Sequence, residues 1–111
     1  RFTDSTISYQ HYGMGVNLNL INIINDFILK DFKADFTFLN TVSLTNMRIR
    51  LKSRKSLNRY DKFKIDFYSN VQKGFLKLAN KNKSRYKIID SNLDINLNAE
   101  IIINTIRKII K

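Results

Sequence analysis

The stretch DFTFL, residues 35–39, decides the fold class of this chain. It is a short run rich in phenylalanine and threonine, which favour extended structure. Such a run predicts a strand that is buried on both faces, as strands of parallel sheets are. A second short run, RYKIID at residues 85–90, predicts another strand.

In the segments that flank these two runs, apolar side chains recur at the spacing of a helix. The stripe in residues 16–34 is amphipathic, and the aromatic stripe in residues 60–84 is more typical of core packing than of a cofactor site. Helices are therefore predicted at 16–34, at 60–84 and at 96–111. Residues 43–59 are predicted to form a further helix, which Ser43 can cap, followed by a basic loop.

The order of these elements predicts the architecture. A loop (1–15) and a helix precede the first strand (35–42), and two helices separate it from a strand and turn (85–92) and a last helix. Strands that alternate with helices indicate an α/β fold with a parallel sheet. Two strands alone would leave open edges, so we expect residues 1–111 to form a single partial domain whose sheet continues outside this chain.

The positive charge is concentrated in one segment. The formal net charge is +11, and eight basic residues stand against one acidic residue between Arg48 and Lys64. Such a segment suits the phosphates of a nucleotide as well as those of a nucleic acid. A small basic nucleic-acid-binding module therefore stays open as an alternative, although the aromatic residues follow helix spacing and are not interleaved with the basic loop. The sequence has no cysteine and no apolar run long enough to span a membrane, so we expect a cytoplasmic protein.

The first fifteen residues, RFTDSTISYQHYGMG, resemble the substrate loop of the thymidylate kinase family. That loop has Asp-Arg-aromatic, a Ser-Thr type pair, an aromatic residue followed by Gln, and a glycine-rich tail. The matching residues here are Arg1-Phe2, Ser5-Thr6, Tyr9-Gln10 and Gly13-Met14-Gly15. The resemblance continues in order through ADFTFLNTV, MRIRLKSRKSLNRYDK, IDFYSNVQKGFLKLA and KIIDSN. It implies the C-terminal part of a P-loop kinase fold, without the phosphate-binding loop, which is absent from these residues.

The resemblance implies transfer of the γ-phosphoryl group of ATP to dTMP, which yields dTDP and ADP. Arg1 would hold the acceptor phosphate with its guanidinium fork. Ser5 and Thr6 would bind the edge of the thymine base. Tyr9 would pack against the deoxyribose and disfavour a 2′-hydroxyl, and Gln10 would reach the base.

The basic loop within 43–59 resembles the family's lid, which closes over ATP and excludes water. Arg54 is the expected transition-state arginine, and Arg59 and Arg50 are the further catalytic candidates. The positions that the resemblance places on the ATP side are Lys52, Asp90, Ser91 and Asn92.

Further expectations follow from the same resemblance. ATP and Mg²⁺ are the implied cofactors, with the metal held by ATP and by residues outside this chain, and a homodimer is implied for the full-length protein. No nucleic-acid or membrane partner is expected, and residues 1–111 alone are expected to be inactive. Another nucleoside monophosphate kinase is a further alternative, which the Ser5-Thr6 and Tyr9-Gln10 pairs disfavour. Four residues depart from the family pattern. Met14 stands where arginine is common, Ser8 replaces a small apolar residue, and Thr41 and Leu44 stand where an aspartate and a proline are common.

Overall fold

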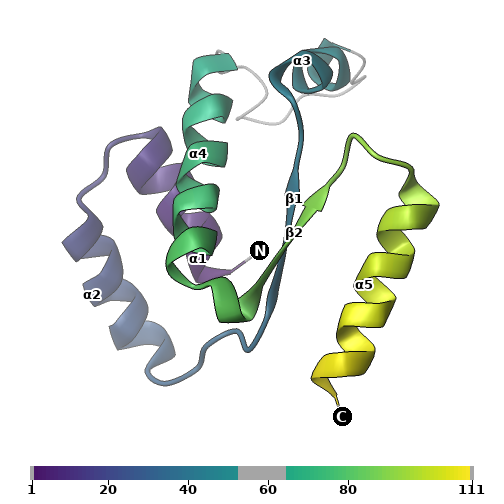
Figure 1. The fold of residues 1–111 in the computed structure, drawn as a ribbon. Helices are drawn as coiled ribbons and strands as arrows, with labels where there is room; N and C mark the ends of the chain where they lie inside the picture. Colours follow the sequence, from purple (N-terminus) through teal and green to yellow (C-terminus); the bar gives the residue numbers. More distant parts are fainter. Residues whose placement is uncertain (1, 53–64, 111) are drawn as a thin grey trace.

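Two parallel strands lie at the centre of the structure, a computed structural model that describes residues 2–52 and 65–110 (Figure 1). Strand β1 is Thr37–Thr41 and strand β2 is Tyr86–Asp90. They pair in parallel along their whole length, from Thr37 opposite Tyr86 to Thr41 opposite Asp90. Parallel strands require a long crossover connection, and helices supply it here. The predicted α/β class with a parallel sheet is confirmed.

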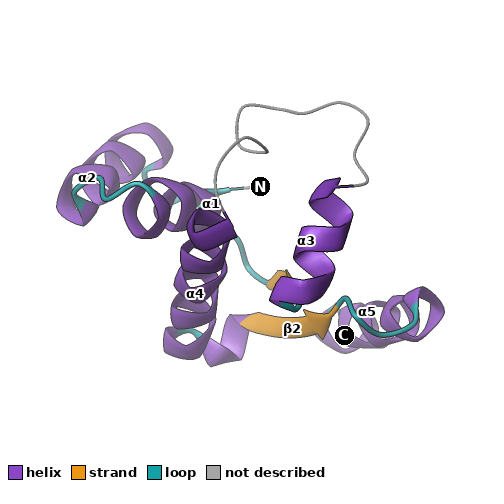
Figure 2. Cartoon of the chain, turned by 90° about the horizontal axis from the view of Figure 1, so that it is seen from above, coloured by secondary structure: helices purple, strands orange, loops and turns teal. Residues whose placement is uncertain are grey.

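Helices form most of the rest of the described chain. They are α1 (Thr3–Thr6), the π-helix η1 (Ile7–Gly13), α2 (Leu18–Leu29), α3 (Leu44–Lys52), α4 (Ile65–Lys81), the 3-10 helix η2 (Lys83–Arg85) and α5 (Ile95–Ile109). Figures 1 and 2 place α4 and α5 on opposite sides of the two strands. Side chains cap three of these helices. Asn17 accepts from the amide of Leu20, Ser43 accepts from the amide of Asn46 as predicted, and Asp94 accepts from the amides that begin α5. The predicted basic loop lies largely in residues 53–64, outside the described part of the chain.

The first fifteen residues are the main departure from the prediction. We expected a loop at 1–15, and the structure has helix from Thr3 to Gly13. This segment packs along α4, and two glycines permit the close approach. A Cβ at Gly13 would lie 2.7 Å from the ring of Phe67, and a Cβ at Gly74 would lie 2.6 Å from the ring of Tyr12. The helical form therefore depends on contact with α4, which glycine-rich local sequence does not reveal.

Burial of the strands also differs from the prediction. The stretch 35–39 was expected to be buried on both faces, yet Leu39 is its only buried residue, and Ile88 of β2 is 44% exposed. The reason lies in the packing, because Leu39 joins Ala79 and Tyr86 in one small core on the side of α4. The remaining strand surface is only partly covered by the described residues.

Ser8 is the most deeply buried side chain of η1. Its exposed fraction is 0%, and its Oγ has no hydrogen-bond partner among residues 2–52 and 65–110. A buried hydroxyl that is left unpaired costs free energy, because water would otherwise bond to it. This serine occupies the position where a small apolar residue is expected.

Replacing Ser8 by alanine should stabilise the protein. We expect the free energy of unfolding of the complete gene product to rise by about 1 kcal/mol, since the unpaired hydroxyl is removed without a cavity of any size. Urea unfolding measures this change. Ser84→Ala, at an exposed serine in η2, is the matched control and should change stability by less than about 0.5 kcal/mol. A loss of stability in Ser8→Ala would show that the hydroxyl is paired.

Candidate functional site

A cavity of about 720 Å³ lies beside β1, walled by the helical first segment and by α4. Its volume is within the range of small-molecule sites, and its lining mixes aromatic rings with a few polar groups. Asp4, Ser5 and Tyr9 contribute from the first segment, and Tyr68, Gln72 and Phe75 contribute from α4. The cavity therefore joins the beginning of the chain to its middle.

A second cavity, of about 370 Å³, lies on the other side of the same segment, toward α2. All four predicted substrate residues that the structure describes line it: Ser5, Thr6, Tyr9 and Gln10. Ser5 and Tyr9 line both cavities. The structure thus gathers these four side chains around a single helical wall, where a loop had been expected to carry them.

Tyr9 is held in this wall by two aromatic residues of α4. Its ring centroid lies 5.9 Å from that of Phe67 and 6.3 Å from that of Phe75, in tilted and edge-on arrangements. Aromatic pairs at such distances are favourable beyond the area that they bury. Of the aromatic residues of α4, Phe75 packs against the small core, and Phe67 and Phe75 together orient a candidate substrate residue.

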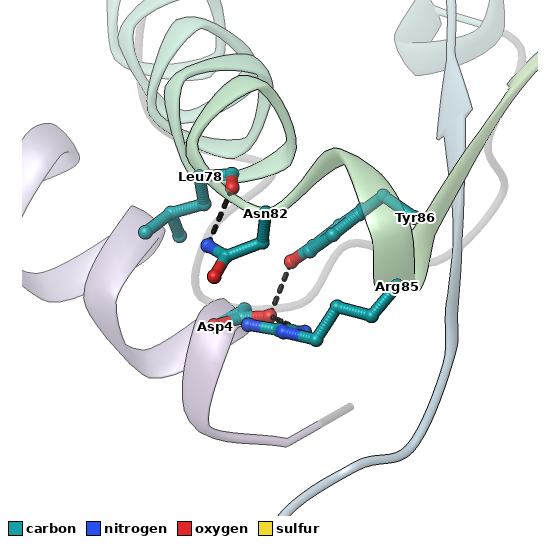
Figure 3. Close-up of polar contacts among 5 residues, drawn as sticks. All are labelled: Asp4, Leu78, Asn82, Arg85 and Tyr86. Carbon is teal, nitrogen blue, oxygen red and sulfur yellow. Dashed lines mark hydrogen bonds and ion pairs between the residues drawn. The ribbon is translucent and has the colours of Figure 1, made fainter.

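A polar cluster connects the same wall to the start of β2 (Figure 3). The carboxylate of Asp4 accepts a hydrogen bond from the hydroxyl of Tyr86 and pairs with the guanidinium of Arg85 at 3.2 Å. Burial raises the pKa of Tyr86 above its ordinary value, and the bond to Asp4 raises it further. Burial lowers the pKa of Arg85, but the combined effect of Asp4 and Tyr86 is larger, so the net shift of this pKa is upward. Tyr86 therefore stays a donor and Arg85 stays charged.

The carboxyl ends of the strands form a second polar cluster, with the turn after β2 facing α3. Arg50 donates to the carbonyl of Ser91 at 2.9 Å, and Asn46 donates to the side-chain oxygen of Asn92 at 2.7 Å. Asp90 accepts from both nitrogens of Asn92, at 2.9 and 2.8 Å. The structure therefore brings the catalytic candidate Arg50 next to three residues predicted for the ATP side, Asp90, Ser91 and Asn92.

The other predicted residues are placed as follows. Lys52 is exposed at the last position of α3. Arg1, Arg54 and Arg59 lie outside the described residues. Across residues 2–52 and 65–110, no three His, Cys, Asp or Glu side chains gather as a metal site would require, so none of these residues is assigned to Mg²⁺.

Two positions at the site escaped the sequence reasoning. Gln72 of α4 bonds both backbone groups of Val42, at 3.0 Å to the nitrogen and 2.9 Å to the oxygen, and so holds α4 to the end of β1. Asp4 lies between the Arg1-Phe2 and Ser5-Thr6 motif positions, and the sequence analysis assigned it no role. The only signal for Gln72 was a polar side chain beside the apolar stripe of a helix, and Asp4 had no signal of its own.

These features define a class of protein. In open α/β sheets, ligands bind beyond the carboxyl ends of the strands, where this chain places a basic residue and a polar turn. The two cavities, lined by aromatic and polar side chains, have volumes within the range of small-molecule sites. The arrangement is that of an α/β protein whose strand ends and cavities suit the binding of small molecules.

The chain belongs to the thymidylate kinase family. The family model described as thymidylate kinase matches residues 1–102. The thymidylate kinase of Wolbachia pipientis subsp. Culex pipiens is 36% identical over 110 residues, which cover 97% of this chain and 52% of the relative. That of Sulfurihydrogenibium sp. is 31% identical over 108 residues, with the same coverage.

A solved structure gives the same result. The crystal structure of thymidylate kinase from Ehrlichia chaffeensis superposes with a TM-score of 0.68 at 33% identity, covering 96% of this chain and 46% of that protein. The chain spans about half the length of the relatives that it matches. Within residues 2–52 and 65–110, no helix has both the length and the apolar character needed to cross a membrane.

Proposed function

We propose that this chain forms the acceptor-binding part of an enzyme that transfers the γ-phosphoryl group of ATP to dTMP, giving dTDP and ADP. The observation that carries this proposal is that Ser5, Thr6, Tyr9 and Gln10 line one cavity of about 370 Å³, and that two of them also line the larger cavity beside β1. Membership of the thymidylate kinase family supports the choice of substrate.

On the acceptor side, short polar side chains bind the base and one aromatic ring packs against the sugar. Ser5 and Thr6 bond the edge of the base, and Gln10 adds an amide that can both donate and accept. Tyr9, held by two rings of α4, packs against the sugar and leaves no room for a 2′-hydroxyl. Arg1 holds the acceptor phosphate bidentately. A pocket of paired polar groups rejects bases whose donors and acceptors do not match.

On the donor side, MgATP enters as a substrate. Lys52, Asp90, Ser91 and Asn92 lie along its binding site, with the turn at 90–92 beside the adenine. Arg50, Arg54 and Arg59 neutralise the charge that develops on the transferring phosphoryl group, and Arg54 is the principal transition-state arginine. The bond from Arg50 to Ser91 supports one part of this arrangement, the position of α3 beside the donor-side turn.

We also propose that the complete protein is a cytoplasmic homodimer. The exposed apolar face of α2 supports a helical interface, since Phe27 is 81% exposed and Ile23 and Ile28 are 66% and 67% exposed. Sedimentation velocity of the complete gene product measures the state directly, and a monomer at micromolar concentration would refute this part of the proposal.

The activity is tested on the complete gene product with a coupled assay of ADP release. We expect turnover with dTMP and Mg²⁺-ATP, and at least about a 100-fold lower kcat/KM with dCMP or dGMP, because the base edge is read by paired polar groups. Comparison with dUMP measures the contribution of the thymine methyl group. Residues 1–111 produced alone should release no ADP, because they contain no phosphate-binding loop. Absence of turnover with dTMP in the complete protein would overturn the proposal, and a preference for another monophosphate would reassign the substrate.

A further inference from the structure

The cluster of Asp4, Arg85 and Tyr86 joins residues that are 81 and 82 positions apart in the sequence. Arg85 Nη1 and the hydroxyl of Tyr86 both bond Oδ2 of Asp4. The side chain of Asp4 is 16% exposed, that of Arg85 is 30% exposed, and Tyr86 belongs to the buried core. An ion pair that is partly withdrawn from water and shared with a hydroxyl is stronger than an exposed pair.

Helix α1 is the first turn of the helical segment that continues as η1, and it is the part of that segment that lies least buried. Its N-cap residue Phe2 makes no capping hydrogen bond through its side chain, and none of its four residues is buried. The terminal turn of a helix frays readily, so tertiary contacts decide how firmly it is held. Phe2 packs edge-on against Phe32 at 5.7 Å, and Asp4 supplies the polar tether.

The partners of Asp4, Arg85 and Tyr86, are themselves held in place by the end of α4 and the start of β2. Asn82 donates to the carbonyl of Leu78 at 2.8 Å, which closes the end of α4 and leads the chain into η2 (Figure 3). The guanidinium of Arg85 lies 4.9 Å from the ring centroid of Tyr86, and Tyr86 is the first residue of β2. The tether therefore ties α1 to the sheet and to α4 at one point.

Asp4 directly precedes Ser5, and Tyr9 follows one turn later in η1. Any rotation of α1 would move these two side chains, which line both cavities. We propose that the Asp4–Arg85–Tyr86 cluster is a positioning device that holds the acceptor-binding wall in its binding-competent orientation. This inference rests on the proposed function for its kinetic readout. If only a fraction of the molecules has this wall correctly placed, the apparent Kd for the ligand is the intrinsic Kd divided by that fraction.

The alternative role for Asp4 is direct contact with the acceptor, since it also lines the larger cavity. Within residues 2–52 and 65–110, its carboxylate bonds Arg85 and Tyr86, and a carboxylate repels an anionic nucleotide. The two roles predict different kinetics. A positioning residue changes the affinity for every acceptor in the same proportion, whereas a contact residue changes the ratio between dTMP and dUMP.

The test uses the complete gene product with Asp4→Asn, Asp4→Ala and Tyr86→Phe. Tyr86→Phe removes only the hydroxyl, so it preserves the core if the Asp4 variants fold poorly. We expect Asp4→Ala to raise KM for dTMP about tenfold, with KM for ATP within about twofold and the dTMP to dUMP ratio unchanged. Tyr86→Phe should raise KM for dTMP about threefold. Glu100→Gln, which removes an exposed carboxylate of α5, is the control and should change neither constant.

A second measurement does not depend on activity. Amide hydrogen exchange of residues 3–13 should quicken by about tenfold in Asp4→Ala, while exchange in α5 stays unchanged. Unchanged exchange and unchanged KM for dTMP in Asp4→Ala would overturn the inference, as would a changed dTMP to dUMP ratio. If the unmodified protein has no activity toward dTMP, the proposed function fails, and faster exchange in residues 3–13 still supports the tether.

Discussion

Gly74→Val is expected to lower the free energy of unfolding of the complete protein by about 3 kcal/mol, a large part of an ordinary domain's stability. A Cβ at this buried position of α4 would lie 2.6 Å from two ring carbons of Tyr12 and 2.8 Å from its Cβ. The ring alone cannot move aside, because the contact includes the atom nearest the backbone of η1. The helical wall would have to separate from α4, and kcat/KM for dTMP should fall together with stability.

Two further variants separate this clash from ordinary helix effects. Lys73→Val inserts the same side chain at the exposed neighbouring position of α4, and it should cost less than about 1 kcal/mol. In a Tyr12→Ala background, Gly74→Val should cost much less than in the unmodified protein, because the opposing ring is gone. Thermal and urea unfolding measure the unmodified protein, the three single variants and the double variant. Equal stability of Gly74→Val and Lys73→Val would show that η1 and α4 do not pack as described.

Tyr9→Ala is expected to lower kcat/KM for dTMP about 100-fold in the complete protein. The ring of Tyr9 forms part of both cavities and rests on Phe67 and Phe75, so its removal joins the cavities and deprives the sugar of its packing surface. The loss should appear mainly in the acceptor kinetics, with KM for ATP changed less than about threefold. Discrimination against the ribonucleotide counterpart of dTMP should fall at least about tenfold, because the ring no longer excludes a 2′-hydroxyl.

Tyr9→Phe keeps the ring and removes the hydroxyl, and it is the matched control. It should retain kcat/KM within about threefold and keep the preference for the deoxyribonucleotide. If Tyr9→Ala discriminates between the two sugars as well as the unmodified protein does, the ring of Tyr9 does not exclude the 2′-hydroxyl, whatever the variant's stability.

The α/β class could be predicted because local periodicity reports it. Apolar residues at helical spacing indicated α2, α4 and α5, and two short runs indicated the parallel strands. The pairs Ser5-Thr6 and Tyr9-Gln10 could be selected because their order and spacing resemble the substrate loop of the thymidylate kinase family. These properties are local, so each can be recognised without knowledge of the partner segment.

The conformation of the first segment could not be predicted in the same way. Residues 1–15 contain two of the chain's glycines and a mixture of polar and aromatic side chains, which locally suggest a loop. The helix forms because Gly13 and Gly74 allow η1 to lie against α4 and because Asp4 binds Arg85 and Tyr86. Neither contact is visible in any short window of sequence.

The sequence by itself determined the helices and strands from α2 onward, and its resemblance to a family pointed to the side chains that suit a nucleotide. The tertiary structure decided how the candidate site is assembled: Ser5 and Tyr9 on a helical wall, Gln72 holding α4 to the end of β1, and Arg50 against Ser91. The physical reason is that periodicity specifies an apolar face but not the surface that it meets. The partner of a polar side chain dozens of residues away is chosen only when the packed elements bring the two groups within hydrogen-bond distance.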